Sequence, residues 1–286
     1  MNLIKLLGKY KASDESKKTH TIIPNLKSKE YKFGATYSIP DNLVKDSCDL
    51  FYRYLFETKG TLSITEAFPD VCPLYIDLDI DFDGSQTIRQ YTDNTIDTLV
   101  HFLHDHIREN IEYEGDLVCY VQEKSKPKLN ESGGVIKEGL HLLYPQLIGD
   151  FKVFNELFKY LSQQDISSFL STLKTQPQNK PEKIFDCQVK RWFLYGSGKP
   201  NGEPYRVTKK YINLELQDSI ENDRELFELF YLTKQFEKNI SYKNNLHEIP
   251  VMKSVSSEVG LTILEDEYEP VDLDSEEEEI YNEIEK

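Results

Sequence analysis

The sequence is poor in the features that mark secreted, zinc-binding and membrane proteins. It has four cysteines in 286 residues, and no two of them form a Cys-x-x-Cys pair, which argues against a zinc site built from local spacing. No run of 18 apolar residues occurs, so we expect no membrane-spanning helix. The apolar cluster near the start, residues 3–7, is interrupted by a lysine, and we expect no signal peptide. These absences predict a protein of a reducing compartment, cytoplasmic and not secreted.

The chain also lacks the surplus of positive charge that is usual in nucleic-acid-binding proteins. Its formal net charge is −16, but residues 265–286 contain twelve acidic residues and one lysine and so account for −11 of it. The other 264 residues carry a net charge of only −5. A polyanionic ligand is therefore not excluded, because the acidic segment is expected to be a separate, disordered tail or linker.

Hydrophobic periodicity divides the chain into helices and strands. The expected helices are 41–56, 94–111, 151–173 with a break near 163–165, and 224–238, and the expected strands are 74–82, 117–122, 139–144 (ending at Pro145) and 185–195. Strands separated by helices predict an α/β or α+β sheet domain. We expect a loose basic arm at residues 1–25, one large domain at 26–264 and the acidic tail at 265–286.

Aspartate alternates with apolar residues along the strand predicted at 74–82. Successive side chains of a strand point to opposite faces, so Asp77, Asp79 and Asp81 share one face while the apolar side chains between them enter the core. Like charges on one face repel each other, and a fold tolerates them where a positive charge neutralises them. Carboxylate oxygens are the ligands that Mg²⁺ and Mn²⁺ prefer. The pattern predicts a divalent-cation site, with a solvated strand end as the alternative.

A second strand places nitrogen donors in the same kind of alternation. Lys137, Gly139 and His141 fall on one face of residues 137–144, and the opposite face is apolar from residue 140 onward. The glycine leaves space beside the two nitrogen donors, and this arrangement suits a triphosphate. Taken alone, however, a single histidine on a strand is more often structural.

A third stretch, residues 185–200, begins with an aspartate and continues into cationic side chains. It contains Asp186, then Lys190 and Arg191, and then a Gly/Pro-rich turn that carries Lys199. By itself this pattern is also that of an ordinary strand and hairpin. What it adds is a third acid, followed by cations, after the other two motifs.

Taken in this order, the three stretches resemble the archaeo-eukaryotic primase superfamily. That family has an apolar strand with Asp-x-Asp, a small-x-His strand and an apolar-Asp motif, which correspond here to residues 77–79, 139–141 and 185–186. The similarity covers residues 37–206 and is greatest to the N-terminal primase domain of primase-helicases of large eukaryotic DNA viruses and to eukaryotic primase-polymerase. It implies an α+β fold, with an RRM-like sheet flanked by helices as the catalytic core, and makes residues 26–264 the catalytic domain.

The resemblance also implies a reaction and its residues. A 3′-hydroxyl would attack the α-phosphate of an NTP or dNTP on a single-stranded DNA template, with two Mg²⁺ or Mn²⁺ ions stabilising the attacking and leaving oxygens. The catalytic acids and metal ligands would be Asp77, Asp79 and Asp186. The nucleotide-binding residues would be Lys137, Gly139, His141, Arg191 and Lys199. The resemblance further implies a helicase domain or subunit as a partner and, for a viral protein, a place in the host cytoplasm or at a viral replication site. The absence of a long apolar run predicts that no membrane is a partner.

Two positions depart from the family pattern. Gly139 stands where serine is frequent, which removes a hydroxyl that could contact phosphate. Phe193 stands where an arginine is expected, which leaves Lys190 or Arg191 to supply that charge. The lysines at positions 124, 126 and 128 form either a loop that follows the template backbone or a solvated loop.

Other functions share parts of these motifs. An apolar strand ending in Asp-x-Asp is also typical of metal-dependent glycosyltransferases, which do not account for the Lys-x-Gly-x-His strand or for Asp186. A catalytically inactive nucleic-acid-binding relative is a further alternative, and the intact acids argue against it. Residues 79–84 imitate the start of an EF-hand, but position twelve of that loop is Gln90 instead of glutamate. Residues 196–199 imitate a P-loop, but Phe193 replaces its first glycine.

Overall fold

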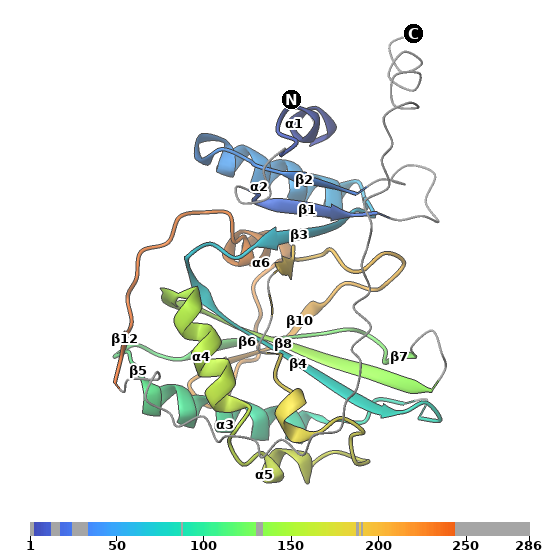
Figure 1. Cartoon of the computed structure of the whole chain (residues 1–286), viewed down its shortest axis with the longest axis vertical. Helices are drawn as coiled ribbons and strands as arrows, with labels where there is room; N and C mark the ends of the chain where they lie inside the picture. Colours follow the sequence, from blue (N-terminus) through green and yellow to red (C-terminus); the bar gives the residue numbers. More distant parts are fainter. Residues whose placement is uncertain are drawn as a thin grey trace, which may run out of the picture. The chain divides into compact units, whose positions relative to one another are not determined.

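The computed structural model describes residues 3–12, 18–24, 34–86, 88–129, 134–186, 189 and 191–243. The large sheet at its centre is antiparallel, with neighbouring strands in the order β11-β10-β6-β8-β4 and with β7 paired to β8 (Figure 1). Its strands are β4 (Val71–Asp83), β6 (Val118–Glu123), β7 (Lys128–Leu129), β8 (Val135–Asp150), β10 (Arg206–Ile212) and β11 (Glu215–Leu216). The long strands β4 and β8 lie side by side and carry the first two sequence motifs.

Helices cover the apolar face of the large sheet. Helix α3 (Asp93–Asn110) begins at a capping box in which the Thr92 hydroxyl accepts from the N–H of Thr95 and the Thr95 hydroxyl accepts from the N–H of Thr92. Its buried side chains recur at helical spacing and pack on β8, where the His104 ring lies 5.6 Å from the Tyr144 ring. Helix α4 (Phe151–Leu161) contacts β4 and β8, and α5 (Ser167–Leu170) contacts α3. In the described ranges, no helix combines the length and hydrophobicity needed to span a bilayer.

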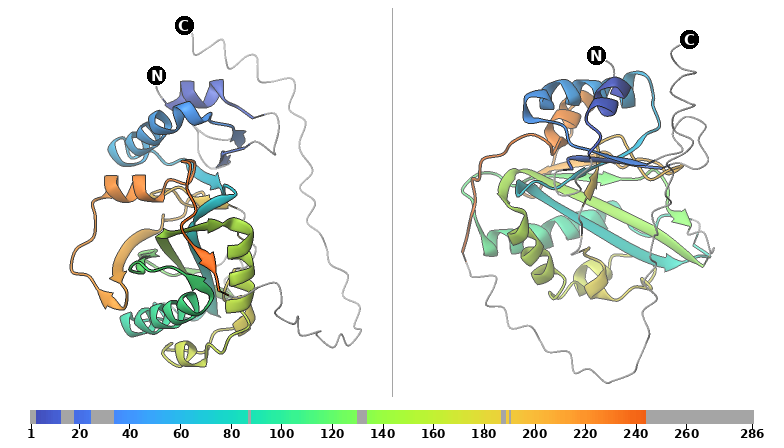
Figure 2. Two further views of the ribbon diagram at one scale, coloured as in Figure 1. Left: turned by 90° about the vertical axis from the view of Figure 1, so that its left-hand side faces the viewer. Right: turned by 45° about the horizontal axis from the view of Figure 1, so that its top comes forward.

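A second, smaller antiparallel sheet has the strand order β2-β1-β3-β9. Its strands are β1 (His20–Ile23), β2 (Ala35–Tyr37), β3 (Ser63–Ala67) and β9 (Arg191–Phe193). The helices α1 (Leu3–Lys9), α2 (Val44–Tyr52) and α6 (Asp223–Phe230) gather at this end of the domain (Figures 1 and 2). A separate pair, β5 (Ile111–Glu112) with β12 (Ser241–Tyr242), follows α3.

The N-terminal residues form regular structure, so the loose arm predicted at residues 1–25 was wrong for the described part of that segment. Leu3, Leu6 and Leu7 are buried in α1 at the three- and four-residue spacing of one helix face. Strand β1 pairs with both β2 and β3. These short apolar clusters become stable only through contacts that are distant in the sequence. The acidic tail predicted at 265–286 lies outside the described residues.

Strand β8 continues to Asp150 and does not end at Pro145 as predicted. The pairing with β4 passes from Leu74↔Tyr144 to Pro73↔Ile148, so residues 145–147 bulge out of the ladder. Proline has no N–H to donate and is tolerated in a sheet at such a bulge. The strand therefore runs on beyond the proline and leads directly into α4.

The buried carboxyl group of Glu66 binds the residues that follow α6 and so connects them to the small sheet. Glu66 of β3 accepts hydrogen bonds from the N–H groups of Leu232 (3.0 Å) and Thr233 (2.9 Å) and from the Thr233 hydroxyl (2.7 Å). Burial raises the pKa of Glu66 to about 7 and lowers the pKa of His20, whose Nε2 lies 3.7 Å away, to about 3. The helix predicted at 224–238 ends at Phe230 because the N–H groups that follow bond to Glu66.

Candidate active site

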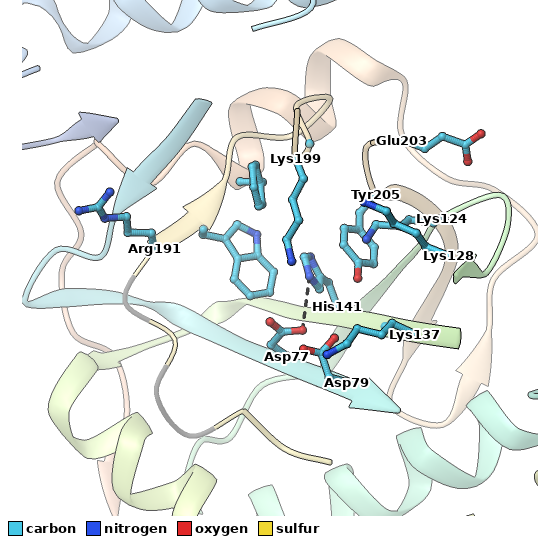
Figure 3. A pocket seen from close by; sticks show the side chains of 14 residues that line it. Asp77, Asp79, Lys124, Lys128, Lys137, His141, Arg191, Lys199, Glu203 and Tyr205 are labelled. Carbon is cyan, nitrogen blue, oxygen red and sulfur yellow. Dashed lines mark ion pairs between the residues drawn. The ribbon is translucent and has the colours of Figure 1, made fainter. Parts of the chain in front are cut away.

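The register between β4 and β8 sets the acids opposite the nitrogen donors. Residues opposite each other across an antiparallel pair point to the same face. The opposite pairs are Asp77 with His141, Asp79 with Gly139, and Asp81 with Lys137. The first two sequence motifs therefore share one face of the large sheet (Figure 3).

Asp186 approaches the same face from the other edge of β4. Phe185 forms an isolated antiparallel bridge with Leu78, and the N–H of Asp186 donates to the carbonyl oxygen of Asp77 at 3.0 Å. Leu78 and Phe185 are both buried in the core. Asp186 and Asp77, the neighbours of this core pair, consequently share the other face, and the structure brings the three predicted acids together.

Asp77 has both of the other acids, Asp79 and Asp186, as neighbours. Its side chain is 19% exposed, but its Oδ1 atom is buried and has no hydrogen-bond partner among the described residues. Burial and the charges of Asp79 and Asp186 raise the pKa of Asp77 well above its usual range. Ionising this carboxyl group therefore requires a positive charge close by.

His141 does not supply that positive charge. Its Nε2 lies 3.4 Å from Asp77 Oδ1, but burial and the charges of nearby lysines lower the pKa of the imidazole well below its usual range. The ring is therefore neutral near pH 7, so the Asp77 carboxyl group has an uncharged imidazole beside it. Its side chain is 8% exposed and lines the cavity described next, so a ligand meets it from the cavity side.

A cavity of about 320 Å³ lies over the acids. It is lined by side chains of β4, β8 and β9 and of the loop segments that carry Lys124 and Lys199. Its cationic lining residues are Lys124, Lys128, Lys137, Arg191 and Lys199. Cationic side chains thus surround a floor of carboxylates, an arrangement that suits divalent cations below and an anion above them.

The predicted nucleotide-binding residues take different positions around this cavity. The ammonium group of Lys199 points toward His141 and Asp77, whereas Arg191 lies at the far side and points away (Figure 3). Lys137 is 55% exposed, and its Nζ lies 3.7 Å from Asp81 Oδ1. Arg191 is thus the predicted residue that this conformation does not bring to the acids. Lys190, the other cation considered for the same task, lies outside the described residues.

Two aromatic rings that no motif indicated enclose His141. The Trp192 ring of β9 lies 4.3 Å from the imidazole, and the Tyr205 ring is stacked on it at 3.5 Å with an interplanar angle of 23°. Lys124 Nζ lies 4.3 Å from the centre of the Tyr205 ring, and burial lowers the pKa of this lysine. Lys124 therefore lines the cavity, whereas the sequence had left open a loop that follows the template backbone and a solvated loop. The only feature of the sequence that could have indicated a role for Tyr205 in the site is its position directly after the Gly/Pro-rich segment that carries Lys199.

The donor set fits a hard divalent cation. Asp79 and Asp186 lie near Asp77, and the Oδ1 atom of Asp77 is buried without a hydrogen bond. As the side chains stand, no three Asp, Glu, His or Cys groups of the described residues are close enough together to hold an ion. Binding would therefore require these carboxylates to turn toward a shared point. Asp79, Asp81 and Asp83 all lie within β4, and this strand conformation excludes the EF-hand loop.

A match to a family model shows that the fold is that of an archaeo-eukaryotic primase domain. The sequence model of the family described as "C962R protein N-terminal AEP domain" matches residues 27–211, and the chain belongs to this family. The resemblance and the α+β fold class expected from the sequence are thereby confirmed. Primase-like nucleotidyl transfer is the chemistry of this family.

Part of the chain is also similar to a curated viral protein. The chain is 30% identical over 195 residues to the "Putative helicase L207/L206" of Acanthamoeba polyphaga mimivirus. The matched region covers 64% of this chain and 20% of the mimivirus protein, so the chain spans about a fifth of that protein's length.

Proposed function

We propose that this domain joins NTPs or dNTPs in a template-directed reaction on single-stranded DNA, with two Mg²⁺ or Mn²⁺ ions held by Asp77, Asp79 and Asp186. The observation that carries the proposal is the convergence of Asp186 on the Asp77–His141 pair beneath a rim of lysines. When bound, the ions would stabilise charge on the attacking and leaving oxygens. The family membership favours this reaction over glycosyl transfer.

Two groups of residues would bind the nucleotide and its metal ions: the carboxylates at the base of the cavity and the lysines around its opening. The carboxylates of β4 and of residue 186 define where the cations and the α-phosphate lie. Lys199, Lys137 and Lys124 attract the phosphate chain as mobile point charges. His141 is neutral and held between two rings, so it offers a fixed ring N–H as a hydrogen-bond donor to a phosphate oxygen.

The similarity to a mimivirus helicase supports a helicase domain or subunit as a partner. In that arrangement the helicase would expose single-stranded template and this domain would synthesise on it. Nucleotides, template and helicase are then the three classes of partner for this chain.

Incorporation of labelled nucleotide on single-stranded DNA tests the proposal. Primed and unprimed strands are offered with NTPs and dNTPs separately, and a sugar nucleotide is offered in parallel. We expect products whose sequence follows the template, loss of synthesis with a chelator, and recovery with added Mg²⁺ or Mn²⁺. Hydrolysis of the sugar nucleotide without any nucleotide incorporation would contradict the proposal.

Replacing His141 with alanine should weaken nucleotide binding more than it slows the chemical step. Loss of a hydrogen bond to a charged phosphate corresponds to roughly tenfold or more in affinity. We therefore expect a KM for the nucleotide that is about tenfold higher, with a smaller change in kcat. His101→Ala is the matched control, because this histidine is exposed on α3 and bonds the Asp97 carbonyl oxygen. A fall in kcat at unchanged KM would contradict the phosphate-binding role.

A further inference from the structure

The position of Tyr205 is fixed by its neighbours on both sides. Its ring is stacked on His141 at 3.5 Å, and Lys124 Nζ lies 4.3 Å from the ring centre. Because the imidazole occupies one face of the ring, the ammonium group takes the other. The phenol is therefore held in one plane, and its hydroxyl points along that plane toward Asp79 (Figure 3).

Gly139 provides the space that this hydroxyl occupies. A Cβ atom at position 139 would lie 2.2 Å from the Tyr205 oxygen and 3.3 Å from Asp79 Oδ1. Any other residue at position 139 would thus displace the phenol tip from its place beside Asp79. Gly139 and Tyr205 form a matched pair, although they lie far apart in the sequence.

The surroundings of the hydroxyl indicate what it binds. No hydrogen bond joins it to another residue in the part of the chain that the structure describes, and Tyr205 lines the cavity together with Lys124, Lys137 and Lys199. The hydroxyl lies beside Asp79 in a cavity that these lysines line, so it can donate to an anion that the lysines attract. The carboxyl groups of Asp77 and Asp79 line the same cavity, so an anion would bind beside them together with cations, as a nucleoside triphosphate does.

We propose that the Tyr205 hydroxyl donates a hydrogen bond to the phosphate chain of the incoming nucleotide, and that Gly139 is needed because it lets the hydroxyl reach this position. The proposal rests on the proposed function and assigns a substrate-binding residue that the family motifs do not include. It gives the cavity a donor that recognises phosphate by hydrogen bonding, in addition to the charge of the lysines.

Nucleotide affinity of the full chain, measured by calorimetry in the presence of Mg²⁺, tests the proposal. Tyr205→Phe keeps the ring and its stacking on His141 but removes the donor. We expect ATP and dATP to bind about tenfold more weakly, because a hydrogen bond to a charged group is lost. The affinity for AMP should change less than about twofold, and in the synthesis assay KM should rise while kcat stays within about threefold.

The matched control is Tyr120→Phe, which removes a hydroxyl on β6 that donates a hydrogen bond to Glu221 and lies outside the residues that line the cavity. It should leave the affinity for ATP unchanged. Unaltered or tighter binding of ATP to Tyr205→Phe would overturn the proposal, and tighter binding would identify Tyr205 as a side chain that the nucleotide has to displace.

A double-mutant cycle tests the pairing with Gly139. Gly139→Ala should weaken ATP binding about as much as Tyr205→Phe, and the double variant should bind about as weakly as either single variant. If the fold losses in ATP affinity of the two single variants multiplied in the double variant, this would contradict the matched pair. If the wild-type chain shows no preference for ATP over AMP, the proposed function itself fails. A clear wild-type preference that is unaltered in Tyr205→Phe overturns only the role of Tyr205.

Discussion

Asp79→Asn is expected to reduce template-directed synthesis by about a thousandfold or more. The substitution keeps the size of the side chain but removes one of three carboxylates that would neutralise paired divalent cations. Asp79 lies opposite Gly139 at the exposed side of the cluster, so its loss disturbs the packed core little. Steady-state incorporation of labelled nucleotide on a primed strand measures the effect.

Asp83→Asn is the control for Asp79→Asn. Asp83 lies on the same strand face, further along β4, and accepts a hydrogen bond from the N–H of Ser85 at 2.9 Å. Removing this charge should change synthesis less than about threefold. If the Asp79 variant were as active as the wild type, the carboxylate cluster would have no part in the reaction.

Glu66→Ala is expected to lower the free energy of unfolding by about 3 kcal/mol or more. The substitution leaves the N–H groups of Leu232 and Thr233 without their acceptor and opens a space beside His20, in a region with almost no solvent access. For a domain of this size such a loss lowers Tm by about 6 °C or more. Urea and thermal unfolding of the full chain measure it.

Glu66→Gln separates hydrogen bonding from charge. The amide oxygen can still accept from the N–H groups of Leu232 and Thr233, so we expect a loss of only about 1 kcal/mol. Because β3 carries β9, and β9 carries Trp192, the alanine variant should also weaken nucleotide binding. If the two variants were equally stable, Glu66 would not be the acceptor that holds this segment.

The sequence alone was sufficient to predict which acids of β4, and which residues of β8, share a face. Strand alternation fixes which side chains share a face, so the pairing of Asp77 with Asp79, and of Gly139 with His141, follows from the order of residues alone. The placement of Asp186 beside Asp77 required the family resemblance, because one isolated bridge carries no periodic signal. The break after α4 and the strands β4, β6 and β8 followed from hydrophobic periodicity, whereas β10 and the end of α6 did not.

The walls of the site could not be predicted because they depend on contacts distant in the sequence. Strand β9 has three residues and is stable only by pairing with β3, and this pairing brings Trp192 onto His141. Tyr205 is placed by stacking on His141 and by the absence of a Cβ at position 139. Neither constraint leaves a pattern in the local sequence.

The two sheets therefore have separate tasks in the proposed mechanism. The large sheet supplies the acids and His141 through a register fixed by β4 and β8. The small sheet supplies Trp192 and, through the loop after β9, Lys199 and Tyr205. A nucleotide would bind in the cavity that lies between β9 and the face of β4 and β8 that carries the acids.

Anomalous diffraction from crystals grown with Mn²⁺ and a non-hydrolysable nucleoside triphosphate tests the central claim most directly. We predict manganese peaks bound by the carboxylates of Asp77, Asp79 and Asp186, with the phosphate chain beside His141 and Lys199. Manganese bound elsewhere, or a triphosphate seated away from this cavity, would contradict the account.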